Sequence, residues 1–208
     1  MSTKPPVLTP LPVLGAKLRT YELLIKSAMA LVEEGGVLTV AAVAAKANIP
    51  RATAYRYFPS RSRLVSAVVD FSLGDVRSFE TTETDGAAAL QQLFETTFPR
   101  FHVYEPQLRA ALQIALEHEA LQRSGALKEE PYRRGYRVAT LIKTTKSLKQ
   151  QLKPPTYKRL VHSLALIYGI EPYVVFKDIL GLDSQGTEKM AIWMMQAVVE
   201  KALRDGSK

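Results

Sequence analysis

Apolar residues recur along the chain at intervals of three and four positions, which is the spacing of amphipathic helices. In the first such segment Leu24, Ala28 and Leu31 share one helical face, and two consecutive glycines at 35 and 36 end the helix. Nine helices are predicted in this way: Lys17–Glu34, Thr39–Ala47, Pro50–Phe58, Ser60–Thr81, Asp85–Tyr104, Pro106–Arg123, Glu130–Leu152, Pro155–Leu180 and Thr187–Leu203. The sequence contains no convincing strand pair and no internal repeat, so an all-α fold is predicted.

Segments without this periodicity predict where the domains meet. Residues 1–15 contain four prolines and a single charge, which is typical of a flexible, proline-rich arm. Residues 81–86 are polar and are predicted to be a loop. We therefore expect one domain over residues 16–74 and a second over residues 75–208.

Two short helices with a tight turn between them are predicted in residues 39–58. Thr39 is placed to cap the first helix, whose apolar residues form one stripe. Asn48 follows this helix and tolerates the left-handed backbone that ends helices. Pro50 then stands in the first turn of the next helix, where its missing N–H costs nothing. The pattern predicts helix, turn and helix.

The second of these helices has two faces of different chemistry. On a helical wheel Ala54 and Phe58 point inward, whereas Arg56 points the opposite way with Tyr55 beside it. A face that combines arginine, a phenol and small side chains suits the DNA major groove, where arginine pairs with guanine N7 and O6. Tyrosine hydroxyls and Arg51 also suit phosphates. The alternative for each tyrosine is a ring packed in the core.

Residues 39–64, TVAAVAAKANIPRATAYRYFPSRSRL, resemble the helix-turn-helix of the TetR family of transcriptional regulators. The residues that match the common form of the family are Thr39, Val43, Ala44, Ala47, Thr53, Tyr55, Tyr57, Phe58, Ser60 and Leu64. Three positions depart from it: Asn48 replaces the usual glycine, Pro50 a serine or threonine cap, and Arg61 a lysine. Pro50 implies a slightly different docking of the helix start.

The resemblance implies a fold, a partner and roles for individual residues. It implies a nine-helix fold with an N-terminal helix-turn-helix domain and a C-terminal domain for ligand binding and dimerisation. The expected function is a homodimeric repressor that binds double-stranded DNA at an inverted repeat and is released by a small molecule. The residues that it implies to face the DNA bases are Arg51, Ala52, Thr53, Tyr55 and Arg56. The residues that it implies to contact the DNA backbone are Thr39, Tyr57 and Arg61, and Pro50 stands at the start of the recognition helix.

The last two long segments predict a dimer interface. Residues 190–199, MAIWMMQAVV, are apolar around the whole helix, and residues 160–170, LVHSLALIYGI, nearly so. Such helices are buried on both sides, either between their own core and a partner chain or in the centre of a monomer. The residues predicted at the interface are Leu160, Leu164, Ile167, Met190, Met194, Met195 and Val198. Pro172 predicts a kink or break near residues 169–172.

An aromatic stripe marks a candidate effector pocket in the middle of the chain. Phe94, Phe98 and Phe101 recur at helical spacing, and ligand pockets are mostly apolar with a few polar groups. The family resemblance implies such a pocket, whereas stripes of this kind also form plain core. The residues predicted to line it are Phe94, Phe98, Phe101, Leu112, Leu116, Tyr136 and Tyr168.

The net charge of +8 is concentrated at the start of the chain. Residues 1–74 hold nine lysines and arginines against four acidic residues, whereas residues 75–208 hold 19 against 16. This distribution favours an anionic polymer as partner, with a solvated basic surface as the alternative. A second basic run, residues 133–159, places Lys143, Lys146, Lys149 and Lys153 on one predicted stripe. That stripe is either a solvated face or a surface for an acidic partner.

Other classes of protein find little support. The sequence has no cysteine, no secretory signal and no run of the ~20 apolar residues that cross a bilayer, so a soluble cytoplasmic protein without membrane contact is expected. The three histidines lack ligand spacing, and no catalytic or phosphate-binding motif is present. We therefore predict no enzyme, no cofactor and no metal. The remaining alternative is an architectural DNA-binding dimer without an effector.

Overall fold

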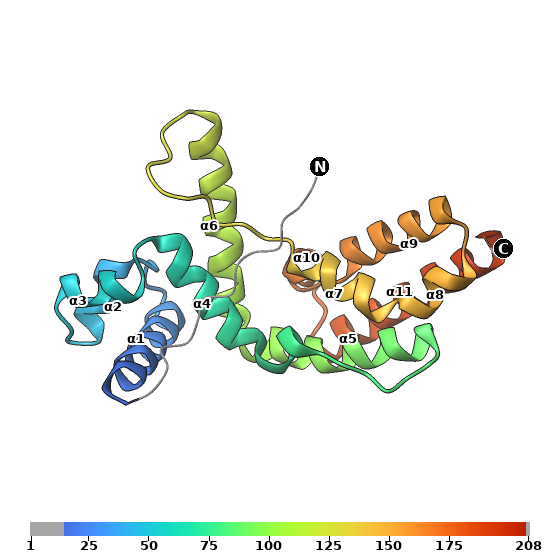
Figure 1. Cartoon of the computed structure of the whole chain (residues 1–208), viewed down its shortest axis with the longest axis horizontal. Coiled ribbons are helices and arrows are strands. Elements are labelled where there is room, and N and C mark those ends of the chain that lie inside the picture. The colour runs from blue at the N-terminus through green and yellow to red at the C-terminus, as the bar shows by residue number, and fades with distance from the viewer. Residues whose placement is uncertain (1–14, 207–208) are drawn as a thin grey trace. The chain divides into compact units, whose positions relative to one another are not determined.

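The regular structure of the chain is entirely helical in residues 15–206, which are the residues that the computed structural model describes (Figure 1). The helices are α1 (Ala16–Glu33), α2 (Val40–Lys46), α3 (Arg51–Tyr57), α4 (Arg61–Leu73), the 3-10 helix η1 (Gly74–Ser78), α5 (Gly86–Val103), α6 (Glu105–Arg123), α7 (Tyr136–Thr144), α8 (Lys146–Gln151), α9 (Pro154–Ile167), α10 (Ile170–Asp178) and α11 (Ser184–Gly206). The all-α prediction is confirmed. The predicted arm at residues 1–15 lies almost wholly outside the described residues.

Eleven α-helices occur in the described residues where nine were predicted, because two predicted helices are each divided. The helix expected over residues 130–152 begins only at Tyr136 and breaks at Thr145. Its first part is loop because Pro131 cannot donate a backbone hydrogen bond and disfavours helical backbone at the residue before it. Gly135, with φ 140°, then marks the point where α7 starts.

The second divided helix breaks where Pro172 predicted it would. α9 ends at Ile167, α10 begins at Ile170, and the two axes differ by 50°. Pro172 becomes the third residue of α10, where a backbone N–H has no partner inside the helix. The helix expected over residues 60–81 also ends early, because Gly74 takes a left-handed backbone with φ 50° and the chain continues as η1.

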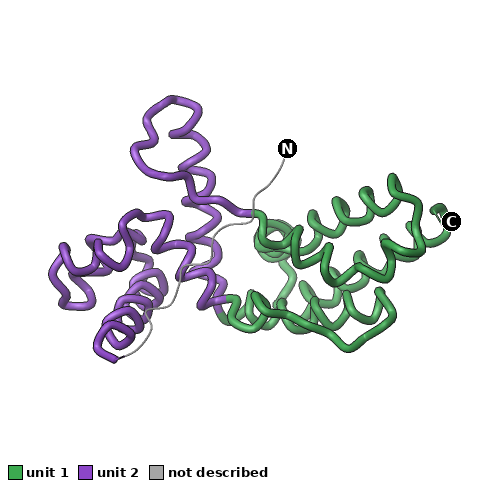
Figure 2. The backbone as a smooth tube through the Cα atoms, in the orientation of Figure 1, with its two compact units in different colours: residues 1–5, 73–103, 135–208 green, residues 6–72, 104–134 purple. Residues whose placement is uncertain are grey.

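The helices form two compact units, which Figure 2 distinguishes by colour. Among the described residues, unit 2 contains residues 15–72 and 104–134, and unit 1 contains residues 73–103 and 135–206. Unit 2 therefore combines the predicted helix-turn-helix with α6 and the loop that follows it. The functional division of the chain into a DNA-binding and an effector domain stays a prediction.

The core of unit 2 brings α1, α2, α3 and α4 together with α6. Leu24 and Ala28 of α1, Ala44 of α2 and Leu64 of α4 are fully buried. The side chain of Gln107 on α6, also fully buried, donates to the backbone carbonyl of Met29 at 3.2 Å. Since this contact joins α6 to the end of α1, the helix-turn-helix is built on α6 as much as on its own three helices.

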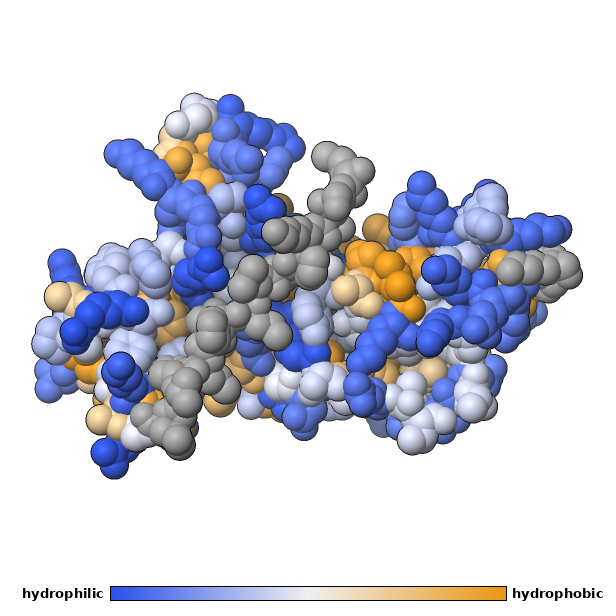
Figure 3. Space-filling view, viewed as in Figure 1, coloured by the Kyte–Doolittle hydropathy of each residue, from blue (hydrophilic) through white to orange (hydrophobic). Residues whose placement is uncertain are grey.

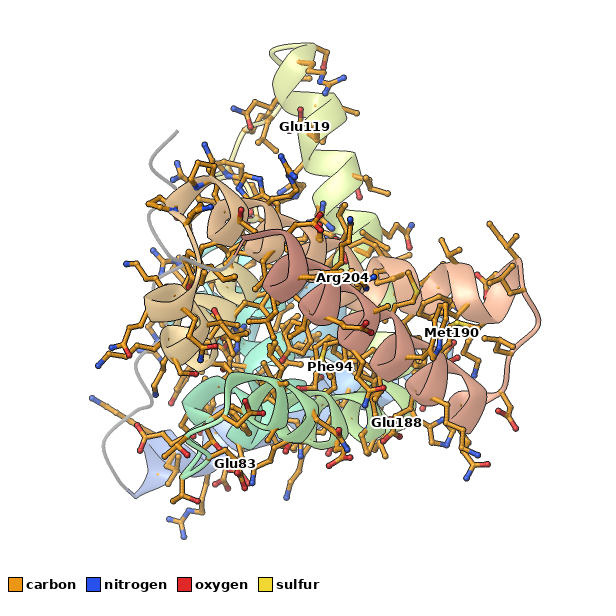
Figure 4. All side chains as sticks on the ribbon, turned by 90° about the vertical axis from the view of Figure 1, so that its right-hand side faces the viewer. Glu83, Phe94, Glu119, Glu188, Met190 and Arg204 are labelled. Atoms are coloured by element: carbon orange, nitrogen blue, oxygen red, sulfur yellow. The ribbon has the colours of Figure 1, made fainter. Side chains whose placement is uncertain are left out.

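The core of unit 1 is a layer of aromatic and aliphatic side chains between α5, α9 and α11, the helices with the most extensive mutual packing. Phe94, labelled in Figure 4, is fully buried on α5. Leu164 on α9 and Met195 on α11 are also fully buried. The predicted stripe of four lysines does not lie on one helix, because α7 and α8 separate at Thr145 and Lys153 follows α8.

No single helix among residues 15–206 is long and apolar enough to cross a membrane. α9 and α10 reach that length and apolar character only together, as a pair bent by 50°, and buried core helices have the same character.

Candidate nucleic-acid interface

The helix-turn-helix begins with α2, which is capped at both ends. The Thr39 hydroxyl accepts a hydrogen bond from the Ala42 backbone N–H at 3.1 Å, which satisfies one of the free donors at the helix start. After the helix, Asn48 takes φ 52° and the Ile49 N–H donates to the Ala44 carbonyl at 2.9 Å. This is the glycine-type helix ending with asparagine in the left-handed position, as predicted from the sequence.

Pro50 then sets the start of α3. Its backbone is extended, with φ −53° and ψ 135°, and it stands just before the helix. The Pro50 carbonyl accepts from the N–H groups of Thr53 at 2.9 Å and Ala54 at 3.1 Å. Pro50 therefore supplies the first helical acceptor without a side-chain cap, which a serine or threonine would have added.

The inward face of α3 is held by two fully buried side chains, Ala54 and Phe58. The Phe58 ring lies 5.5 Å from the ring of Tyr21 on α1, measured between centroids. α3 has only seven residues, and helices of that length do not hold together alone in water. Its orientation is therefore fixed by these buried contacts.

The outward face of α3 carries the residues that were predicted to meet DNA bases. Arg51, Ala52, Tyr55 and Arg56 are exposed, and Thr53 is half-buried. Tyr55 is 46% exposed, so its ring lies at the surface and not in the core. The Arg56 guanidinium donates to the Thr53 hydroxyl at 3.3 Å, a weak contact that leaves most of its donors for a ligand.

The residues predicted to bind the DNA backbone lie in two different environments. Tyr57 is half-buried at the end of α3, and Thr39 is half-buried with its hydroxyl already engaged in the helix cap. The Arg61 side chain, only 18% exposed, donates to the Leu38 carbonyl at 2.8 Å and to the Glu117 carboxylate at 2.9 Å. A phosphate at Arg61 would have to replace these contacts, so its predicted role stays a prediction.

The residues predicted to line an effector pocket divide between the two units. Five of them belong to unit 1, whereas Leu112 and Leu116 lie on α6 in unit 2, where Leu116 is 59% exposed. In unit 1 the rings of Phe94 and Tyr168 are 5.2 Å apart and those of Phe98 and Phe101 are 5.4 Å apart, measured between centroids.

Two polar groups belong to the aromatic cluster of unit 1. Burial raises the pKa of Tyr168 to about 12, so its phenol stays neutral. The Thr97 hydroxyl donates to the Leu93 carbonyl at 2.7 Å, and Tyr168 therefore donates to Thr97 at 2.8 Å. Tyr136 lies apart from this bond: its hydroxyl donates to the Arg77 carbonyl, and the Arg77 guanidinium stacks 4.3 Å above its ring.

The residues predicted at a dimer interface also differ in exposure. Leu160, Leu164, Ile167 and Met195 are buried inside unit 1, whereas Met190, Met194 and Val198 are partly exposed on α11. The most exposed large apolar side chains of this unit were not predicted: Leu166 at 77% on α9, Ile179 at 75% just after α10, and Trp193 at 65% on α11. Because residues 160–170 and 190–199 are apolar around the whole helix, the sequence pattern did not single out Leu166 and Trp193, and Ile179 lies beyond the end of α10.

The fold and the exposed face of α3 define a helix-turn-helix protein of the all-α class. Residues 24–68 match the family model for bacterial regulatory proteins of the tetR family. This match supports a TetR-family transcriptional regulator with a helix-turn-helix segment. The match begins in α1 and ends in α4, so residues 69–208 lie outside it. No curated protein matches the chain in sequence.

Arg56→Ala is expected to weaken binding to duplexes selected from a random pool by about 1–3 kcal/mol, because the arginine predicted to read a base is lost. Lys149→Ala is the matched control, since Lys149 is an exposed cation on α8 in the other unit. Dissociation constants for a selected and a scrambled duplex measure both effects. Equal losses for the two variants would place the binding surface elsewhere.

Proposed function

We propose that the protein is a homodimeric repressor that binds an inverted-repeat operator in the cytoplasm and is released by a small, largely apolar effector. The observation that carries the proposal is the outward face of α3, where Arg51, Tyr55 and Arg56 are exposed while Ala54 and Phe58 hold the helix from behind. A recognition helix presented in this way enters the major groove and reads base edges with the residues of its free face.

Dimerisation is supported by apolar side chains that unit 1 leaves exposed. On α11, Met190, Trp193 and Ala197 recur at spacings of three and four, opposite the buried Ala191 and Met195. Figure 3 shows hydrophobic residues gathered on one face of unit 1, near the positions of α7, α9 and α10 in Figure 1. Apolar patches of this kind mark protein interfaces. A two-fold dimer would present two α3 helices to half-sites one DNA turn apart.

Effector binding is proposed at the aromatic cluster around Phe94, Phe98, Phe101 and Tyr168. The cluster combines buried aromatic rings with the neutral phenol of Tyr168 and the hydroxyl of Thr97. This combination suits a largely apolar ligand with one polar group. An effector releases DNA only if it binds the DNA-free conformation more tightly than the DNA-bound one. Without an effector, the same dimer would be an architectural DNA-binding protein.

The proposal is tested on a duplex selected by the protein itself from a random pool. If each subunit neutralises three or four phosphates, the logarithm of the binding constant should fall with the logarithm of salt at a slope of about −5 to −7 for the dimer. A slope near −1 would contradict this docking. Small apolar metabolites should then release the bound duplex, whereas no small molecule should dislodge an architectural protein.

Trp193→Glu is expected to raise the dissociation constant of the dimer at least about a hundredfold, because each subunit would lose the burial of one large apolar side chain. Gln150→Glu is the control, since it adds the same charge at an exposed polar position of α8. Sedimentation equilibrium measures both variants. If Trp193→Glu had the same dimer dissociation constant as the wild type, α11 would not belong to the proposed interface.

A further inference from the structure

The loop that follows α6 folds back onto the start of α4 within unit 2. Figure 1 shows this loop at the free end of α6, and Figure 2 shows it in the unit of the helix-turn-helix. The Glu129 carboxylate accepts the backbone N–H of Arg61 at 2.7 Å. The Glu130 backbone carbonyl accepts the Ser62 hydroxyl at 2.6 Å. Two residues of the loop therefore bond directly to the first turn of α4.

Three carboxylates meet the polar groups at the start of α4. Glu117, in the C-terminal half of α6, forms an ion pair with Arg61 at 2.9 Å. Glu130 forms one with Arg63 at 2.6 Å and also accepts the Ser60 hydroxyl at 3.2 Å. Together with the bond from the Arg61 N–H to Glu129, these contacts engage the side chains of Arg61, Arg63 and Ser60 and one backbone N–H at the start of α4. We call Glu117, Glu129 and Glu130 the acidic clasp.

A buried histidine fixes the position of the clasp. His118 is 2% exposed, and its Nδ1 accepts the backbone N–H of Tyr132 at 3.1 Å. Its Nε2 lies 3.4 Å from the nearer oxygen of Glu129. Because Nδ1 is an acceptor, the neutral ring carries its proton on Nε2, which faces that carboxylate. The ring thus connects α6 to both ends of the loop segment 129–132.

The groups held by the clasp are the kind that DNA phosphates bind. Arginine side chains, serine hydroxyls and N–H groups at helix starts are among the donors that proteins use to bind DNA phosphates. They lie at residues 60–63, directly after α3, whose outward face is proposed to enter the major groove. A carboxylate and a phosphate oxygen compete for the same donors, and three nearby negative charges repel the duplex.

We propose that the acidic clasp is an autoinhibitory contact, in which Glu117, Glu129 and Glu130 occupy the donors of Arg61, Arg63 and Ser60 that DNA phosphates take over on binding. Glu117 and Glu130 are about half-exposed, and ion pairs of this exposure are weak enough to be exchanged. This inference rests on the proposed DNA-binding function.

The test compares two glutamates in similar settings. Glu130 pairs with Arg63, and Glu119, labelled in Figure 4, pairs with Arg123 on α6 at 2.9 Å. Glu130→Gln and Glu119→Gln each remove one negative charge and one ion pair, but only the first opens the clasp. The probe is a fluorescent duplex of mixed sequence and about 40 base pairs, enough for two half-sites one turn apart. Anisotropy titrations of the full chain at several salt concentrations give affinity and slope.

Glu130→Gln should bind the duplex about two- to fivefold more tightly than Glu119→Gln. Its salt slope should be steeper by about 0.9 for each subunit, because one more phosphate is neutralised. Adding Arg63→Gln to Glu130→Gln should abolish the gain, since the released arginine makes the new contact. Glu117→Gln, which removes the ion pair of Arg61, is a second variant with the same expected direction, and thermal unfolding confirms that each variant is folded.

Three results separate the possibilities. Equal affinities for Glu130→Gln and Glu119→Gln would overturn the inference, as would a gain that survives loss of Arg63. Weaker binding by folded Glu130→Gln would show that the clasp supports docking, which also overturns it. Absence of duplex binding by the wild type and every variant would instead refute the proposed function.

Discussion

The burial of Ala54 and Phe58 is the constraint on which the rest of unit 2 depends. A seven-residue helix has no stability of its own, so α3 exists because these two side chains are removed from water against α1 and its neighbours. Burying a side chain as large as phenylalanine contributes about 1.5–3 kcal/mol. Once that face is fixed, helical geometry directs Arg56 and Tyr55 outward, and the chemistry of the exposed face follows.

α6 extends the helix-turn-helix into a larger body. Gln107 bonds to the end of α1, and Arg61 bonds to Glu117 near the other end of the same helix. α6 therefore contacts α1 through its first turn and α4 through its C-terminal half, so unit 2 extends beyond the helix-turn-helix itself. Along the chain, α5 of unit 1 precedes α6, and the loop of residues 124–134 follows α6 within unit 2 before the chain returns to unit 1 at residue 135.

The candidate interface could be predicted because its residues act on backbone close to them in the sequence. Contacts between residues far apart in the sequence could not be predicted from the hydrophobic pattern. Thr39, Asn48 and Pro50 each act on backbone within a few residues, so the turn and the outward face of α3 follow from their chemistry. The partners of Arg61 lie 56 and 68 residues away, and periodicity carries no information on such pairs. The last helices are apolar all round, so the pattern did not distinguish buried Leu164 from exposed Leu166.

The central claim is that the free face of α3 reads the major groove, and methylation interference tests it most directly. Guanine N7 lies in the major groove, where Arg56 would pair with it, whereas adenine N3 lies in the minor groove. On a selected duplex, N7 methylation should block binding at guanines in two half-sites about one helical turn apart. Binding that tolerates every N7 methyl group, or that is blocked only by methylation at adenine N3, would contradict the account.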